Sequence, residues 1–416
     1  MRCVWCLRWS AVASVLRCSH LNRALCARLL LRSLNHTSSS LEDINVSKKY
    51  IINYKELKPG DIILTADKGI VSKGVRLGTL SKYSHAAIYV GGTMIEATLS
   101  GVFSKNPQRL IFDSKDHVAV YRYDGELTES QVEVICSFAR SKICSLYSIP
   151  EATTLRFREL LKKPATKQQF CSRLVALSYS ESGVNLKNLR NPAYCTPKQL
   201  SLCKAFYKVD HMVREATSDE VSFSTTEDPN ITHQKETTEW VREVRKLSQT
   251  NDLSVKYDIQ TINDVDEFLY ENRTFNDSIL EFVKNGGYLT YYKYDTKRNP
   301  WRYDRALLEA VVISHPDKAS FLEAQLKISF NIFNLYRNNL VKYLEYYSST
   351  GLSYYKEHGY LYYNLMNLIY VRSKNINEVS EKLGFKKEAF ISQEVMNRAK
   401  ANCEIATQVI DRCVSA

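Results

Sequence analysis

Short apolar runs separated by turn-forming residues characterise the first half of the chain beyond residue 50. The turn-like run Leu57–Asp61 precedes an apolar run at Ile62–Leu64, which predicts a strand. Two runs of small and β-branched residues flank Gly91 and Gly92, and two glycines in this setting indicate a hairpin because the favoured turns need positive φ. A further strand is predicted at Val118–Tyr121.

Helical periodicity occurs at two places in the same region. Glu129–Ser141 has one apolar face, and a second helix is expected to begin at about Cys171 and to end near Gly183, which suits a C-terminal cap. The apolar face of the first helix consists of Val132, Ile135, Cys136 and Ala139. Because strands and helices are mixed, the sequence predicts an α+β domain at residues 50–207.

The second half of the chain is dominated by helical spacing and by tyrosine. We predict a mostly α-helical domain at residues 235–416, whose role no recognised motif indicates. Residues 215–234 are polar, with little to bury, and are predicted to be a linker. The segments with the clearest helical spacing are Phe321–Leu344, Tyr360–Tyr370 and Val379–Val409, the last with a turn at Gly384.

Half of the formal net charge of +12 comes from the first forty residues. Residues 1–40 contain six arginines and no acidic residue, which leaves +6 over the rest of the chain. Such an N-terminus is typical of a mitochondrial transit peptide, and it is equally consistent with sequence that is not native, with a true start near Val46. Residues 1–45 are therefore treated as a leader outside the fold. Localisation stays open between cytoplasmic and mitochondrial.

Cysteine usage indicates a reducing compartment. Four of the eleven cysteines lie in the leader, and the other seven are irregularly spaced, without the paired CxxC motifs of a zinc site. We therefore expect no disulfide framework, and most of these thiols should be buried apolar groups. No stretch reaches the ~18 apolar residues of a membrane-spanning helix, so no transmembrane segment is predicted.

The hairpin brings two candidate catalytic residues together. If Gly91 and Gly92 are its two loop residues, paired positions sum to 183, which sets Ala87 opposite Glu96. Opposed side chains share a face, so His85 and Glu96 are diagonal neighbours, roughly 7–8 Å apart at the backbone. A carboxylate at this distance can bind one imidazole nitrogen and leave the other as a base.

Cys171 is the candidate nucleophile that matches this base. It lies at the start of a predicted helix, where unpaired backbone N–H groups and the helix dipole favour a thiolate. A nearby imidazolium would lower the thiol pKa further, and N–H groups at the helix start could stabilise an oxyanion. The alternative interpretation is that Cys171 is an inert core thiol and that His85 caps a strand.

Several motifs agree in order and spacing over residues 57–203. They are Leu57–Leu64, Tyr83–Gly92, Met94–Ala97, Phe170–Val175, Ser182–Val184 and Thr196–Leu200. Together they resemble the permuted papain-like amidases of the YiiX/YebB-like family, which are related to the NlpC-type cell-wall peptidases. In unpermuted papain-like enzymes the cysteine precedes the histidine, whereas here His85 comes before Cys171, as the permuted family requires.

The resemblance implies a circularly permuted papain-like fold and assigns roles to individual residues. Cys171 would be the nucleophile, His85 the base and Glu96 the group that orients the base. Tyr147 aligns with a tyrosine near the family's active site, and Arg173 stands where the family commonly has glutamate. We therefore expect Tyr147 and Arg173 to contact the substrate. A glycine that commonly precedes the tyrosine is replaced by Cys144.

Other reactive residues and a second motif compete with this interpretation. His117 could pair with a thiol, but no carboxylate is placed for it, and Cys195 and Cys203 are expected to be structural. Residues 377–390 have the residue spacing of a helix-turn-helix. Two helices joined by a glycine cap give the same pattern. Nucleic acid is therefore not expected as a partner.

The sequence as a whole predicts a cysteine hydrolase that cleaves an amide through an acyl-enzyme on Cys171. The amide could belong to a peptide, an isopeptide or a cell-wall stem peptide, and neither a metal nor an organic cofactor is implied. Two alternatives stay open: an acyltransferase or thioesterase that acts on acyl or lipid substrates, and a binding module without turnover. Substrate identity and oligomeric state are not determined by these residues.

Overall fold

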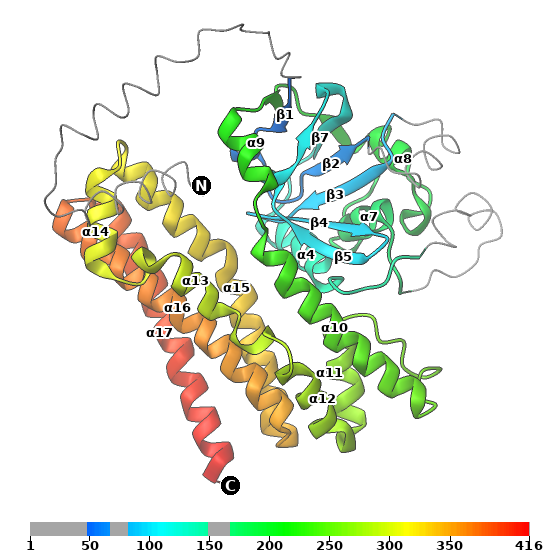
Figure 1. Ribbon diagram of the computed structural model, residues 1–416, viewed down its shortest axis with the longest axis vertical. Helices are drawn as coiled ribbons and strands as arrows, with labels where there is room; N and C mark the ends of the chain where they lie inside the picture. Colours follow the sequence, from blue (N-terminus) through cyan, green and yellow to red (C-terminus); the bar gives the residue numbers. More distant parts are fainter. Residues whose placement is uncertain (1–47, 67–81, 149–166, 416) are drawn as a thin grey trace, which may run out of the picture.

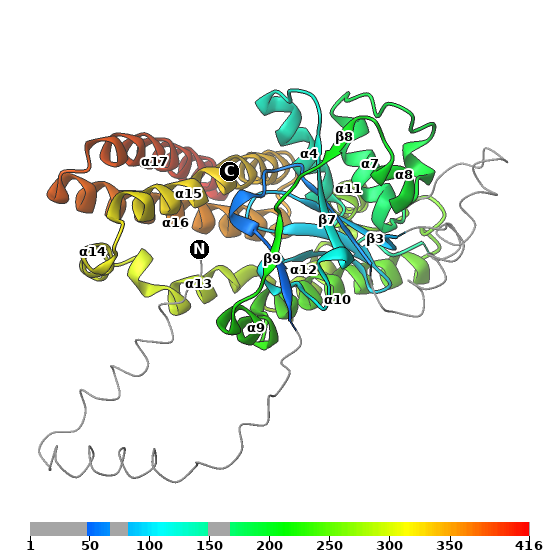
Figure 2. The ribbon, with the colours of Figure 1, turned by 90° about the horizontal axis from the view of Figure 1, so that it is seen from above.

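A mixed sheet-and-helix region and a long helical region make up the molecule (Figure 1). The structure, a computed structural model, describes residues 48–66, 82–148 and 167–415. The predicted leader at residues 1–45 lies outside the described residues. In the two views the strands gather on one side of the molecule, and the three longest helices run side by side on the other (Figures 1 and 2).

The central element is a six-stranded antiparallel sheet in the order β5-β4-β3-β2-β7-β8. A second, three-stranded sheet has the order β6-β1-β9. The strands of the large sheet are β2 (Ile62–Thr65), β3 (His85–Tyr89), β4 (Met94–Thr98), β5 (Gly101–Lys105), β7 (Val118–Tyr123) and β8 (Phe206–Lys208). Those of the small sheet are β1 (Tyr50–Ile52), β6 (Ile111–Phe112) and β9 (Val213–Glu215).

Both faces of the large sheet are buried, which explains the nearly continuous apolar runs of its central strands. Helices α4 (Glu129–Ser141) and α7 (Cys171–Glu181) pack with Ile62, Leu64 and Ile88 into the main core. Ile63 and Val120 point to the opposite face, where residues of β1 and of the 209–213 segment cover them. A short helix, α8 (Pro197–Ser201), lies near the edge strand β8.

The elements predicted for this region are confirmed. Helix α4 occupies the predicted residues, since a capping box between Thr128 and Gln131 sets its start. Helix α7 begins at Cys171 and stops before Gly183, which has a φ of +75°. The fold is α+β, with a mostly helical second part, as the sequence predicted.

Residues 215–234, predicted as a polar linker, are folded. They include the end of β9, all of α9 (Ser218–Thr225) and the first residues of α10 (Pro229–Thr250). Composition alone did not reveal these helices, because their polar residues are caps: Thr217 forms a capping box with Glu220, and Asp228 caps α10. The predicted boundary at residue 207 is therefore too early, because β8 and β9 still belong to the two sheets.

Helix α10 connects the two parts of the molecule. The side-chain amide of Gln234 accepts a hydrogen bond from the backbone N–H of Ser104 and donates one to its carbonyl oxygen at 2.8 Å. Ser104 belongs to β5, the outer strand of the large sheet, so the amide occupies hydrogen-bonding groups that an edge strand otherwise exposes. Whether the two parts also fold independently, as the predicted domain division implies, stays a prediction.

The helical region ends in three long antiparallel helices that pack against one another (Figure 1). Gly351 and Gly384, with φ of +70° and +81°, end the first two of them. The helix pair around Gly384 is therefore a long hairpin rather than a compact helix-turn-helix. The helices are α11 (Ile262–Glu271), α12 (Asn276–Lys284), α13 (Tyr292–Arg298), α14 (Arg305–Ser314), α15 (Lys318–Thr350), α16 (Ser353–Leu383) and α17 (Lys386–Ser415).

Within residues 48–66, 82–148 and 167–415, no helix combines the length and apolar character that crossing a bilayer requires.

Candidate active site

The hairpin between β3 and β4 has the register expected from its two glycines. Gly91 and Gly92 have φ of +87° and +90°, and Ala87 lies opposite Glu96. The diagonal neighbours His85 and Glu96 are in direct contact, with 2.9 Å between Nε2 and Oε2. The carboxylate thus occupies one ring nitrogen and leaves Nδ1 of His85 for another partner.

Lys105 extends this row of charges and was not expected from the sequence. Its Nζ lies 3.6 Å from Oε1 of Glu96, while Oε2 contacts His85. The register of β4 and β5 explains the contact, because Met94 faces Lys105 and Glu96 is the diagonal neighbour on the same face. Finding the contact between Lys105 and Glu96 from the sequence would have required a prediction of the second hairpin, with its turn at Leu99 to Gly101.

Cys171 lies where α7 meets the start of β3. The thiol is only 6% exposed, and it forms a hydrogen bond with the side chain of His85. The backbone N–H groups of Ala86 and Ser172 also donate to its sulfur. Phe170, the N-cap residue, provides no side-chain cap, so the first N–H groups of the helix are left for a thiolate or an oxyanion.

The three side chains shift one another's pKa in the directions that an ion pair requires. Burial opposes ionisation of Cys171, but the imidazole of His85 and the two backbone N–H groups outweigh it and lower the pKa of the thiol. Burial also opposes protonation of His85, yet the thiolate and Glu96 raise its pKa to about 10. Despite its own burial, Glu96 has a lowered pKa because of His85 and Lys105.

The other thiols behave differently. Burial raises the pKa of Cys136 and of Cys403 to about 11 and also raises that of Cys203. Cys195 is buried beside the site, where its thiol donates to the carbonyl of Ser172 at 3.1 Å, and burial raises its pKa well above the ordinary value. These cysteines have the structural character that the sequence predicted for them.

Tyr147 lies close to the candidate nucleophile. Burial, and secondarily the charge of Cys171, raise the pKa of its hydroxyl. The residue is held in place by a parallel β-bridge to Gln169, two residues before Cys171. Its position beside the thiol is consistent with a substrate contact, which stays a prediction.

Arg173 does not have the position expected of a substrate-binding residue. Its side chain is 0% exposed and donates to two backbone carbonyl oxygens, that of Ala193 at 2.8 Å and that of Gln168 at 2.7 Å. The guanidinium also lies over the rings of Phe170 and Tyr194. Arg173 therefore fastens the start of α7 to the 193–194 segment, and the predicted substrate contact is corrected to a structural one.

The helical region supports the loop that carries Tyr147. Arg245 on α10 donates to the carbonyl of Cys144 at 2.8 Å and to those of Ile259 and Gln260 at 2.6 and 2.8 Å. Cys144 has a φ of +75°, which is the left-handed region that favours glycine. The departure from the family's glycine thus places a side chain in a strained backbone position, and that side chain is buried among helical-region residues.

The strain at Cys144 leads to a comparison of two variants that both remove the thiol. Cys144→Gly is expected to be more stable than Cys144→Ala by about 1 kcal/mol, because only glycine adopts positive φ without a Cβ penalty. Urea unfolding followed by circular dichroism measures the difference. Equal midpoints for the two variants would show that the backbone at this position is not strained.

Comparison with known proteins agrees with the fold. Residues 56–199 match a family described as permuted papain-like amidase enzyme, YaeF/YiiX, C92 family. This range includes both strands of the hairpin and the start of α7, so the resemblance seen in the sequence is confirmed. Over these residues the chain is similar to a family of permuted papain-like amidases.

A curated protein shows the same relationship over a shorter stretch. The probable lipoprotein peptidase YaeF of Escherichia coli strain K12 is 35% identical over 89 residues, which are 21% of this chain and 32% of that protein. The chain therefore matches about a third of the length of that relative. At the level of the family, the comparison supports a cysteine hydrolase.

Proposed function

We propose that the protein is a cysteine amidase whose nucleophile is Cys171, with His85 as its base and Glu96 as the residue that orients the base. The observation that carries the proposal is the hydrogen-bonded series from Glu96 to His85 to Cys171, with 2.9 Å between the carboxylate and the ring. A structural thiol of equal burial would have a raised pKa, as Cys195 has.

The geometry supports an acyl-transfer reaction to water. The Cys171 thiolate attacks the carbonyl carbon of an amide, and the N–H groups at the start of α7 stabilise the resulting oxyanion. The His85 imidazolium gives its proton to the leaving amine as the C–N bond breaks, which leaves an acyl thioester on Cys171. Neutral His85 then removes a proton from water as the oxygen attacks the thioester. The C–S bond breaks, which releases the carboxylic acid and restores the Cys171 thiolate beside the His85 imidazolium.

Glu96 acts through the imidazole rather than on the substrate. Its carboxylate holds Nε2, which fixes the ring and stabilises the imidazolium. Lys105 in turn helps to keep Glu96 ionised. Because Glu96 contacts the imidazole and not the substrate, we propose it as a positioning residue.

The proposal is tested by trapping the acyl-enzyme. Protein incubated with a panel of peptidyl aminomethylcoumarin amides and activated p-nitrophenyl esters is expected to release the leaving group and to gain the mass of the acyl group on Cys171. Cys171→Ala is expected to lower hydrolysis by at least about 10³-fold. Cys195→Ala is the matched control, since it removes a neighbouring buried thiol that the mechanism does not use.

The two outcomes lead to different conclusions. An adduct on the wild-type protein and on Cys195→Ala, but not on Cys171→Ala, supports the assignment of the nucleophile. Turnover that persists in Cys171→Ala would refute it.

A further inference from the structure

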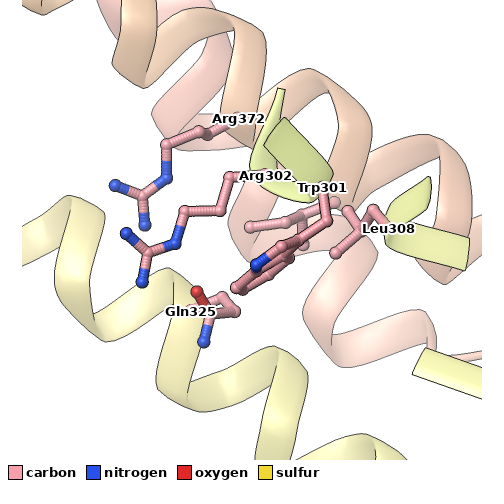
Figure 3. A pocket seen from close by; sticks show the side chains of 6 residues that line it. Trp301, Arg302, Leu308, Gln325 and Arg372 are labelled. Atoms are coloured by element: carbon pink, nitrogen blue, oxygen red, sulfur yellow. The ribbon is translucent and has the colours of Figure 1, made fainter. Parts of the chain in front are cut away.

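A recess in the helical region is lined by two buried arginines. Arg302 comes from the short 3-10 helix Pro300–Arg302, Arg372 from α16 and Gln325 from α15. Figure 3 shows the two guanidinium groups beside each other, with the amide of Gln325 next to that of Arg302. In this conformation these side chains leave no space for a water molecule between them, and apolar residues complete the wall: Trp301, Leu308 and Ile376.

The positive charge of this recess is not balanced by the carboxylate near it. Arg302 and Arg372 are 6% and 5% exposed. Asp295 contacts Arg302 Nη1 at 3.0 Å, but its oxygens also accept from Asn299 at 2.6 Å and from Tyr303 at 2.5 Å. Burial opposes ionisation of Asp295, but the charges of Arg302 and Arg372 lower its pKa. Burial and then the charge of Arg372 lower the pKa of Arg302, which is the direction expected for like charges held together.

Several polar atoms that line the recess have no hydrogen-bond partner within the described part of the chain. They are Nε of Arg302, Nη2 of Arg372 and Oε1 of Gln325, each of them buried. Burying a polar group without a partner is unfavourable, and it is more so when the group is charged. Groups of this kind are therefore expected to have a partner in the functional state of a protein.

We propose that this recess binds the phosphate group of a ligand through Arg302 and Arg372. Guanidinium groups bind phosphate oxygens in pairs of parallel hydrogen bonds, and a phosphate carries enough oxygens and charge for two of them. The amide of Gln325 can rotate to donate an N–H to a third oxygen. The closed recess has no space for a water molecule, so the anion enters only when the two long side chains move apart. This inference is independent of the chemistry at Cys171.

The experiment measures thermal unfolding of the full chain in inorganic phosphate and in chloride of equal ionic strength. Phosphate is expected to raise the Tm of the wild type by about 2–4 °C in a saturable manner. Arg372→Gln is expected to lose this rise. In chloride the variant is expected to be at least as stable as the wild type, because it lacks an unbalanced buried charge.

Two further variants serve as controls, one for the general effect of removing an arginine and one for a possible failure of Arg372→Gln to fold. Arg398→Gln removes an exposed arginine whose contact with Glu394 is 3.6 Å long, and it should keep the full phosphate effect. Arg372→Lys keeps the charge but not the paired donors, so it should show a reduced effect, and it replaces Arg372→Gln as the test if the latter does not fold.

A second arm distinguishes a soluble phosphate from a lipid headgroup. Binding is measured to phosphatidylcholine vesicles with and without phosphatidic acid. Binding that needs phosphatidic acid and Arg372 identifies a lipid headgroup, whereas a Tm rise that needs Arg372 without vesicle binding identifies a soluble phosphate. The proposal is overturned if neither probe acts on the wild type, or if Arg372→Gln responds as fully as the wild type does.

Discussion

Replacing His85 with alanine is expected to slow alkylation of Cys171 by iodoacetamide about 10- to 100-fold at pH 6. Without the imidazole, burial holds the thiol pKa above its ordinary value, so very little thiolate remains at this pH. In the wild type the imidazolium and two backbone N–H groups stabilise the thiolate. Part of the gain in thiolate is offset because a thiolate of lower pKa is a weaker nucleophile.

The pH dependence distinguishes the two proteins more sharply than a single rate. A thiol without a partner loses about tenfold in labelling rate for each pH unit below its pKa, and His85→Ala should follow this line. The wild type should keep a high rate into mild acid, down to the lowered pKa of Cys171. Turnover also needs the imidazolium, so it should fall above pH 10, where His85 loses its proton.

The matched variant for this experiment is Glu96→Gln. It keeps a hydrogen-bonding group beside Nε2 of His85 but removes the carboxylate charge that helps to raise the His85 pKa. Its labelling rate at pH 6 should lie between those of the wild type and His85→Ala. Labelling of Cys171 that is as slow as that of Cys136, and that ignores His85, would mean that Cys171 is a core thiol.

Replacing Asp266 with alanine is expected to lower the free energy of unfolding by about 3–5 kcal/mol. Asp266 on α11 is 1% exposed and accepts hydrogen bonds from Lys342 at 2.8 Å, Tyr343 at 3.1 Å and Tyr354 at 3.0 Å. Burial raises the pKa of this carboxyl in spite of Lys342. Removing it would leave an ammonium and two buried hydroxyls without their common acceptor.

Two variants separate the role of Asp266 from a general effect on α11. Asp266→Asn keeps one acceptor oxygen and should cost about 1–2 kcal/mol, less than alanine. Glu267→Ala removes the exposed neighbour on the same helix and should change stability by less than about 0.5 kcal/mol. Urea unfolding measures all three, and a cost below about 1 kcal/mol for Asp266→Ala would contradict the prediction.

Much of the domain that contains the two sheets could be predicted because its signals are local. Gly91 and Gly92 adopt positive φ with little penalty, and a two-residue loop fixes the pairing of β3 with β4. The contact between His85 and Glu96 follows from that pairing alone. The end of α7 before Gly183 and the turn at Gly384 are likewise set by residues a few positions apart. Such patterns need no knowledge of distant packing.

Contacts between distant segments could not be obtained in this way. His85 and Cys171 are far apart in the sequence, and only the packing of α7 on the large sheet brings the ring to the thiol. Arg173 was predicted to contact the substrate because it stands where the family commonly has glutamate, two residues after Cys171. Its direction depends on the 193–194 segment, whose backbone carbonyl oxygens the sequence does not place.

In the helical region, too, the helices could be predicted from the sequence, whereas the contacts between them could not. Helical spacing and glycine caps specify α15, α16 and α17, since an amphipathic pattern and a left-handed cap are properties of short stretches. Two arrangements arise only when these helices pack. One places Arg302 and Arg372 in the same recess. The other surrounds Asp266 with Lys342, Tyr343 and Tyr354. Charge and hydrogen-bond balance depend on which side chains share a buried volume, and a linear pattern does not contain that information.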